Sequence, residues 1–226
     1  MDYLFFDIEC CDGNHICSFG YVIVDENFNV VEKDDILINP EKPFKLGRAG
    51  FDPEIELAYK QDVFFKQPAF PEFYAGIKKM LSKKDRFLFG HNSGCDVNFL
   101  YIACNRYKLK KLNIKVFDTQ KIYKIYKNDK NVSSLHKILD ELAIGRKKLK
   151  DHKSCDDAEM TMLVVKKLCA EQKLTLREFV VKYKDNVETT TGCINRIKKK
   201  ALKRLYAQRR QRNREAFQRQ NKKEEN

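Results

Sequence analysis

Five short apolar runs along the chain have the length and composition of β-strands. The first is almost continuously apolar and holds three aromatic residues, as expected for a strand that is buried on both faces. The polar segment Asp25-Glu26-Asn27 predicts a turn between the second and third runs, and Asn39-Pro40 ends the third. The predicted strands are residues 3–8, 16–24, 30–38, 86–90 and 115–117.

Apolar residues at helical spacing follow the later strands. Between Ser134 and Gly145, leucine and isoleucine recur at i, i+3, i+4 and i+7, and the glycine is the predicted stop. Further helices are predicted after Pro71, after Asp118-Thr119, and at residues 96–107, 155–169 and 176–183. Three strands followed by alternating strands and helices predict an α/β fold with a mixed sheet.

The connection at residues 40–70 breaks this order. It holds four of the five prolines, and we expect it to be long and irregular. Segments of this kind often carry binding residues, although plain surface insertions are also common.

Length and composition fit one domain of ordinary size with an appendage. With 226 residues, of which 42% are hydrophobic and 12% aromatic, the chain can bury a substantial core. No run approaches the ~20 consecutive apolar residues that a membrane span needs, and the first residues lack the pattern of a signal peptide. We therefore expect a soluble, cytoplasmic protein with no membrane partner.

The net charge of +13 is concentrated at the C-terminus. Residues 194–226 carry 13 Lys and Arg against 3 Glu, whereas the preceding 193 residues carry 32 basic and 29 acidic groups. This balance is typical of an enzyme that contacts a polyanion at one cleft. The Thr-Thr-Thr-Gly segment that starts at Thr189 interrupts the pattern, so we expect a domain at residues 1–185 and a linker with a basic, partly helical or disordered tail at 186–226.

Eight cysteines are scattered along the chain without a C-x-x-C pair. Cys10, Cys11, His15 and Cys17 come nearest to a metal-binding cluster, but their spacing fits no common zinc pattern. We expect reduced thiols that pack as small apolar side chains.

Acidic residues lie where predicted strands end. Asp7 and Glu9 are two apart on a strand, so both carboxylates project from one face, where a cation would offset the cost of removing them from water. Asp96 follows the strand that ends at His91-Asn92, the region where ligands bind in open α/β sheets. Plainer alternatives are a strand end that emerges into solvent and an Asp96 that interacts only with the helix dipole.

His152 lies five residues before Asp157, at a predicted loop-to-helix junction. In one interpretation the aspartate turns toward a cleft and the histidine reaches the same cleft. In the other, Ser154 and Asp157 form a capping box, S-x-x-D, and His152 is an exposed loop residue.

In this order, Asp7-x-Glu9, Asn92-x-x-x-Asp96 and His152-x-x-x-x-Asp157 resemble the three exonuclease motifs of the DnaQ-like superfamily, in its histidine-bearing DEDDh branch. Proofreading exonucleases of the polymerase III epsilon type belong to it. The similarity spans about residues 3–170 and includes Phe117-Asp118-Thr119, which resembles the family's strand ending in Asp-Thr.

The chain departs from the family pattern beside the motifs. Cys10-Cys11-Asp12 stands where Thr-Thr-Gly is frequent, Cys95 where a bulky aromatic residue is frequent, and Ser154 where alanine is usual. All five catalytic positions are filled, so these departures affect the expected contacts to the terminal nucleotide.

The resemblance implies a ribonuclease H-like fold, a mixed five-stranded sheet flanked by helices. It implies that four carboxylates hold two divalent cations, Mg²⁺ or Mn²⁺, with Asp7 bridging them. Such a pair, about 3.5–4 Å apart, orients the nucleophile and neutralises the phosphate. His152 would be the general base. The implied metal ligands are Asp7, Glu9, Asp96 and Asp157.

The implied reaction is 3′–5′ hydrolysis of single-stranded nucleic acid to nucleoside monophosphates, with DNA favoured by analogy. Four residues are candidates to contact the substrate: Ile8, Cys10, His91 and Asn92. His15 and His136 are expected to be structural or exposed. The tail is expected to bind nucleic acid, or to dock on a polymerase or another nucleic-acid-processing protein.

Two alternatives remain. One is an RNA-trimming 3′–5′ exoribonuclease of the same superfamily, because recognition of the 2′-OH depends on a few contacts in the cleft. The other is a subunit that binds nucleic acid or a partner protein without cleaving.

Overall fold

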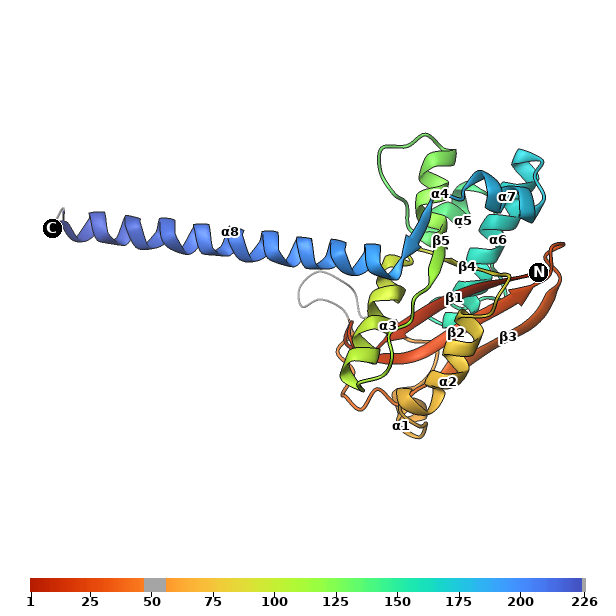
Figure 1. Cartoon of the computed structure of the whole chain (residues 1–226), viewed down its shortest axis with the longest axis horizontal. Coiled ribbons are helices and arrows are strands. Elements are labelled where there is room, and N and C mark those ends of the chain that lie inside the picture. The colour runs from red at the N-terminus through yellow and green to blue at the C-terminus, as the bar shows by residue number, and fades with distance from the viewer. Residues whose placement is uncertain (47–55, 225–226) are drawn as a thin grey trace. The chain divides into compact units, whose positions relative to one another are not determined.

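A computed structural model describes residues 1–46 and 56–224, with side chains as far as residue 215. The chain divides into two units, Met1–Thr190 and Thr191–Asn226 (Figure 1). The expected long connection at 40–70 is only partly covered, because its residues 47–55 lie outside the described ranges. Its described part holds helix α1 (Gln61–Phe65), and its Ala69 forms a bridge with Asn39 just before it.

The first unit is built on a mixed sheet with the strand order β3-β2-β1-β4-β5-β6. The central strand β1 pairs antiparallel with β2 and parallel with β4. The strands are β1 (Asp2–Cys10), β2 (Ile16–Val24), β3 (Val30–Leu37), β4 (Arg86–Gly90), β5 (Lys115–Asp118) and β6 (Val187–Thr189).

The mixed sheet and its flanking helices confirm the predicted fold, but the sheet has six strands where five were expected. The sixth, β6, pairs antiparallel with β5 at the sheet edge. It is three residues long and contains Glu188, so no apolar run or alternation marks it in the sequence. Long-range pairing with β5 decides its conformation.

Seven helices of the first unit are described. They are α1, α2 (Phe70–Leu81), α3 (Gly94–Arg106), α4 (Thr119–Tyr126), α5 (Leu135–Glu141), α6 (Ser154–Gln172) and α7 (Leu176–Lys182). Helix α5 ends before the predicted stop at Gly145. Ala143 has the left-handed conformation, and its N–H and that of Ile144 bond to the carbonyls of Asp140 and Leu139, a Schellman cap without glycine.

Helix α6 covers the centre of the sheet and contacts β1 and β2 along its length. Tyr3 and Phe5 of β1 point into the apolar cluster that α6 completes. Across the sheet Phe5, Phe89 and Phe117 stack, with ring centroids 4.7 and 5.0 Å apart. Because side chains alternate along a strand, the face of Tyr3 and Phe5 is also that of Asp7 and Glu9. The core therefore presents both acids toward α6.

The second unit is a single helix, α8 (Thr190–Glu224), which begins at the last residue of the first unit. This helix includes most of the residues for which a linker and a partly helical or disordered tail were expected. No helix in the described ranges combines the length and the apolar character needed to cross a lipid bilayer.

Candidate active site

The carboxyl end of β1 meets the first turn of α6. In the β1–β2 ladder Asp7 faces Gly20, and in the β2–β3 ladder Gly20 faces Asp35. A Cβ atom at Gly20 would overlap the backbone of Ser154 and Cys155, so the start of α6 rests directly on β2. A glycine here lets the helix backbone approach the sheet closely and brings Asp157 beside Asp7.

Four carboxylates converge at this point. One oxygen each from Asp7, Glu9 and Asp157 lies within 4.8 Å of the other two. Asp96 joins them from the first turn of α3, where its carboxylate accepts a hydrogen bond from the backbone N–H of Ile8. The structure thus brings together residues from β1, α3 and α6 that are as much as 150 positions apart in the sequence.

Burial and mutual repulsion make these carboxylates hard to ionise. Burial, followed by the charges of Asp96, Glu9 and Asp157, raises the pKa of Asp7 well above its usual value. Burial also raises the pKa of Asp96, and burial together with the charge of Glu9 raises the pKa of Asp157 to about 8. None of these three aspartates has a Lys or Arg ion-pair partner among the described residues.

This arrangement fits divalent cations. Buried charges persist in proteins when they are paired or bind metal, and an all-oxygen set of carboxylates suits hard cations such as Mg²⁺ and Mn²⁺. Burial raises the pKa values of these aspartates most, and the neighbouring negative charges add to it. A bound cation would offset both effects, because it stabilises the ionised carboxylates.

His152 lies at the same place. Its Nδ1 is 3.5 Å from Oε1 of Glu9, and the hydrogen bond to Glu9 raises the pKa of His152. Its side chain is 41% exposed, so the imidazole is open to water. The backbone of His152 has a left-handed φ of 57°, and its N–H donates to the carboxylate of Asp157.

Ser154 does not act as the N-cap that the capping-box alternative required. The N-cap of α6 is Lys153, which makes no side-chain cap, and the Ser154 hydroxyl contacts the hydroxyl of Ser18 on β2 instead. Asp157 therefore lies one turn inside the helix, where its carboxylate faces the acidic cluster.

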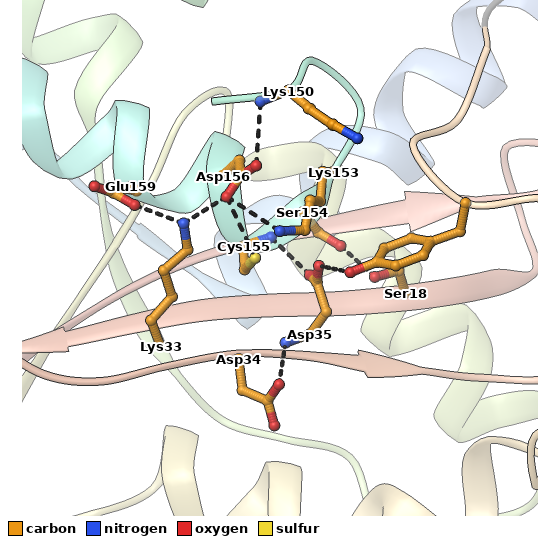
Figure 2. Close-up of polar contacts among 11 residues, drawn as sticks. Ser18, Lys33, Asp34, Asp35, Lys150, Lys153, Ser154, Cys155, Asp156 and Glu159 are labelled. Carbon is orange, nitrogen blue, oxygen red and sulfur yellow. Dashed lines mark hydrogen bonds and ion pairs between the residues drawn. The ribbon is translucent and has the colours of Figure 1, made fainter. Parts of the chain in front are cut away.

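A second network ties the start of α6 to strand β3 (Figure 2). Asp35 accepts a hydrogen bond of 2.7 Å from the backbone N–H of Cys155. Lys33 lies against Asp156 and 2.6 Å from Glu159. Sequence patterns gave no sign of Asp35 or Lys33, because both depend on the packing of β3 against a helix 120 residues later. Gly20, a lone glycine inside an apolar run, could have indicated a close backbone approach here, but it was not singled out in the sequence.

The four candidate substrate contacts lie in different environments. Ile8 is buried, and Cys10 is partly exposed next to Glu9. Asn92 has a left-handed φ of 53° and donates from its side chain to Cys95. The Nδ1 atom of His91 lies 3.1 Å from Oγ1 of Thr119, and burial lowers the pKa of His91 to about 4, so its ring is neutral.

The other two histidines make local contacts. His15 lies 2.8 Å from Asp12, and with Cys11 the two residues form a second group of metal-capable atoms within 4.8 Å. Asp12 also accepts from the backbone N–H groups of Asn14 and His15, which closes a tight turn. His136 contacts Arg146 on the surface of α5.

Residues 15–168, more than half of the chain, match the DEDDh family model described as DNA polymerase III subunit epsilon-like, C-terminal domain. The chain therefore belongs to this DEDDh exonuclease family. The match includes Asp96, His152 and Asp157, and it begins after Asp7 and Glu9. No curated protein sequence is significantly similar to the chain.

Solved structures share the fold at low sequence identity. A 3′-exonuclease described in 3′-end specific recognition of a histone mRNA stem-loop is 16% identical with a TM-score of 0.58, and the alignment covers 72% of this chain and 61% of that one. E. coli Exonuclease I in complex with a dA16 oligonucleotide is 14% identical with a TM-score of 0.55, covering 75% and 41%. S. pombe Pop2p, in a Mg²⁺ and Mn²⁺ bound form, is 16% identical with a TM-score of 0.54, covering 74% and 82%. The chain thus spans less than two thirds of the first two proteins.

Proposed function

We propose that this chain is a metal-dependent 3′–5′ exonuclease that removes nucleoside monophosphates from the 3′ end of single-stranded nucleic acid. The observation that carries the proposal is the convergence of Asp7, Glu9 and Asp157, with Asp96 beside them and His152 against Glu9. These are the four acids and the base that the resemblance to DEDDh exonucleases implies for phosphodiester hydrolysis.

Asp7, Glu9, Asp96 and Asp157 would hold two divalent cations, Mg²⁺ or Mn²⁺. When bound, such cations supply charge neutralisation at the phosphate and lower the pKa of bound water. The Mg²⁺ and Mn²⁺ bound form of Pop2p supports the choice of metal by analogy. Because no Lys or Arg of the described residues pairs with the three aspartates, their negative charge stays available to a metal.

His152 would accept the proton of the attacking water. Its Nδ1 faces Glu9, so a proton on Nδ1 directed at that carboxylate leaves Nε2 with a free lone pair. Glu9 also stabilises the imidazolium that forms, which agrees with the raised pKa of His152. Because the side chain is 41% exposed, it can release the proton to solvent after each turnover.

The test is degradation of a 5′-labelled single-stranded oligonucleotide with Mg²⁺ or Mn²⁺. We expect a ladder that shortens from the 3′ end, and EDTA should abolish it. Asp7→Ala should remove the activity, because one carboxylate of the cation site is lost. Activity that persists in purified Asp7→Ala protein would contradict the site. A protein that binds the oligonucleotide without shortening it would favour the non-cleaving alternative.

The substrate is proposed to be DNA, by analogy with the epsilon-like family and the dA16 complex of Exonuclease I. RNA is the second candidate, because another structural neighbour is a 3′-exonuclease that recognises the 3′ end of a histone mRNA stem-loop. Matched DNA and RNA oligomers of one sequence separate the two, since only the RNA offers a 2′-OH.

The basic helix α8 is proposed to bind the nucleic-acid strand. Residues 196–214 hold ten Lys and Arg, all exposed, a density of charge that complements a phosphate backbone. A polymerase or another nucleic-acid-processing protein is the alternative partner for this helix, because the apolar side chains of Leu202, Leu205 and Tyr206 are exposed as well.

A further inference from the structure

We propose that Tyr59 and Asp35 are positioning residues that hold His152 and the start of α6 in the geometry required for catalysis. The inference rests on the proposed function of His152, and nothing in the family motifs includes either residue. The evidence is a continuous set of hydrogen bonds from the segment 57–59, hereafter the strap, to β3, to α6 and to the backbone of His152.

The backbone of His152 is in a conformation that needs support. Its φ of 57° lies in the left-handed region, which residues with a Cβ atom rarely adopt unless surrounding contacts impose it. Both of its backbone polar groups are engaged. The N–H donates to Asp157, and the carbonyl accepts a bond of 3.2 Å from the N–H of Ala58 in the strap. The strap therefore fixes one side of the loop that carries the imidazole.

The strap is itself anchored on both sides of Ala58. Leu57 is buried in an apolar cluster with Cys11, Cys17 and Phe64, and the ring of Tyr59 packs edge-on against Phe64 at 6.0 Å. The Tyr59 hydroxyl donates a bond of 2.8 Å to Oδ2 of Asp35. Burial and this contact raise the pKa of Tyr59, so the phenol keeps the proton that it donates.

Asp35 connects the strap to the start of helix α6. Its Oδ2 accepts from Tyr59, and its Oδ1 accepts from the backbone N–H of Cys155, in the first turn of α6. Lys153, the N-cap, provides no side-chain cap, so Asp35 satisfies one of the free N–H groups that begin a helix. Since both of its oxygens are engaged by donors, Asp35 acts on the cation site through α6 and not as a ligand.

The position of Asp35 follows from the sheet. Asp35 pairs with Gly20 in the β2–β3 ladder, and Gly20 pairs with Asp7 in the β1–β2 ladder. The register of these two ladders therefore places the acid that holds the helix and the acid that would bind the cation in one row across the sheet. Figure 2 shows Asp35 reaching from β3 to the backbone of Cys155. A shift of the helix start by about 1 Å is enough to lower an enzymatic rate about 100-fold.

The experiment compares Tyr59→Phe with the wild-type protein, both as the full chain, on a single-stranded oligonucleotide at saturating Mg²⁺. We expect kcat to fall about 10-fold and KM to change less than about 2-fold, because the strand contacts stay while the base is displaced. Asp35→Ala should lose more, about 100-fold, and Asp35→Asn should recover much of this loss, since an amide oxygen can still accept from Cys155. Tyr126→Phe is the matched control, because it removes another tyrosine–carboxylate bond, that to Glu171, and should leave kcat unchanged.

A second readout does not depend on activity. The chain has four histidines, so the imidazole Cε1–H signal of His152 can be assigned by its loss in His152→Gln. Tyr59→Phe and Asp35→Ala should move that signal, while Tyr126→Phe should not.

An unchanged His152 signal together with an unchanged kcat in Tyr59→Phe would overturn the inference and leave the proposed exonuclease intact. A wild-type protein without nuclease activity would remove the proposed function, and the His152 signal would still decide whether the strap positions this residue. If Tyr59→Phe does not fold, the same two measurements on Asp35→Ala decide.

Discussion

At the scale of single residues, the proposed role of His152 gives the most direct test of the mechanism. We predict that His152→Gln lowers kcat by about 10²- to 10⁴-fold, the usual contribution of a general base, and leaves binding of the oligonucleotide unchanged. Steady-state kinetics and fluorescence anisotropy measure the two quantities. Tyr126→Phe serves as the control and should leave both quantities unchanged, because its hydroxyl contacts Glu171 at the end of α6 opposite the acidic cluster. A His152→Gln enzyme with wild-type turnover would remove this residue from the mechanism.

The wild-type rate should also rise with pH as His152 loses its proton. Glu9 raises the pKa of His152, so the neutral base becomes abundant at a higher pH than for a free histidine. The kcat profile should therefore rise through a pH above about 6.5. Because Glu9 is also a proposed metal ligand, its effect on His152 is tested without turnover: the imidazole signal of His152 should titrate at a lower pH in Glu9→Gln than in the wild type.

The acidic cluster should make the metal-free protein less stable as the pH rises, whereas most carboxylates in folded proteins contribute stability that is lost as the pH falls. The pKa of Asp157 is about 8 in the folded protein, against about 3.9 in an unfolded chain. The folded state thus binds this proton more tightly, and the stability that it contributes is complete below about pH 4 and is lost as the pH rises toward 8. The raised pKa of Asp7 acts in the same direction.

We therefore predict that the metal-free protein melts at a lower temperature at pH 9 than at pH 6. Asp157→Asn should raise the melting temperature at pH 9 and weaken its dependence on pH, while abolishing nuclease activity; a chain of this size shifts by roughly 2–4 °C for each kcal/mol. Mg²⁺ should restore the melting temperature of the native protein far more than that of the variant. Calorimetric scans in EDTA and in Mg²⁺ test this, and a melting temperature independent of pH would contradict the cluster.

At the scale of elements, the approach of α6 to β2 determines the site. Gly20→Ala places a methyl group in the backbone of Ser154 and Cys155, so the helix must shift or the fold must open. We predict a loss of at least about 2 kcal/mol in the free energy of unfolding, together with a fall in kcat, because Asp157 moves away from Asp7.

The matched control is Gly76→Ala on α2, where the added Cβ meets no atom within 4 Å. A glycine inside a helix costs about 0.5–1 kcal/mol relative to alanine, so this variant should be slightly more stable and fully active. Urea titration gives both free energies. Equal effects of the two substitutions would show that α6 does not rest on Gly20.

The sequence predicted the parts of the structure that local patterns or motif order determine, and it missed those that depend on long-range contacts. Apolar periodicity located the strands that pack against a core, and the motif order located Asp7, Asp96 and Asp157 on the right elements. Strand β6 was not predicted, because Glu188 and its neighbours show no alternation of apolar and polar residues. The end of α5 was misplaced, because Ala143 adopts a left-handed conformation that usually favours glycine. The capping-box alternative failed because Ser154 contacts Ser18, which no local pattern reveals.

At the scale of the whole molecule, the two units differ in net charge. The nearly neutral first unit would act on one end of a strand at the acidic cluster, whereas α8 would hold the strand along its phosphates. Of the ten exposed Lys and Arg at residues 196–214, four arginines lie close together in sequence near the end of that range. They are Arg209, Arg210, Arg212 and Arg214.

We predict that replacing these four arginines by glutamine weakens binding to long single strands and lowers the slope of log K against log salt by up to about 3. Each phosphate neutralised on a single strand contributes about 0.7 to that slope, because its counterion is released. The turnover of very short oligonucleotides should change little, since binding of these substrates depends on the acidic cluster and not on α8. The control replaces four exposed lysines of the first unit by glutamine, an equal change in charge: Lys79, Lys84, Lys127 and Lys130. If both variants change the slope equally, net charge alone determines the affinity. If neither variant changes the slope, the arginines of α8 do not hold the strand.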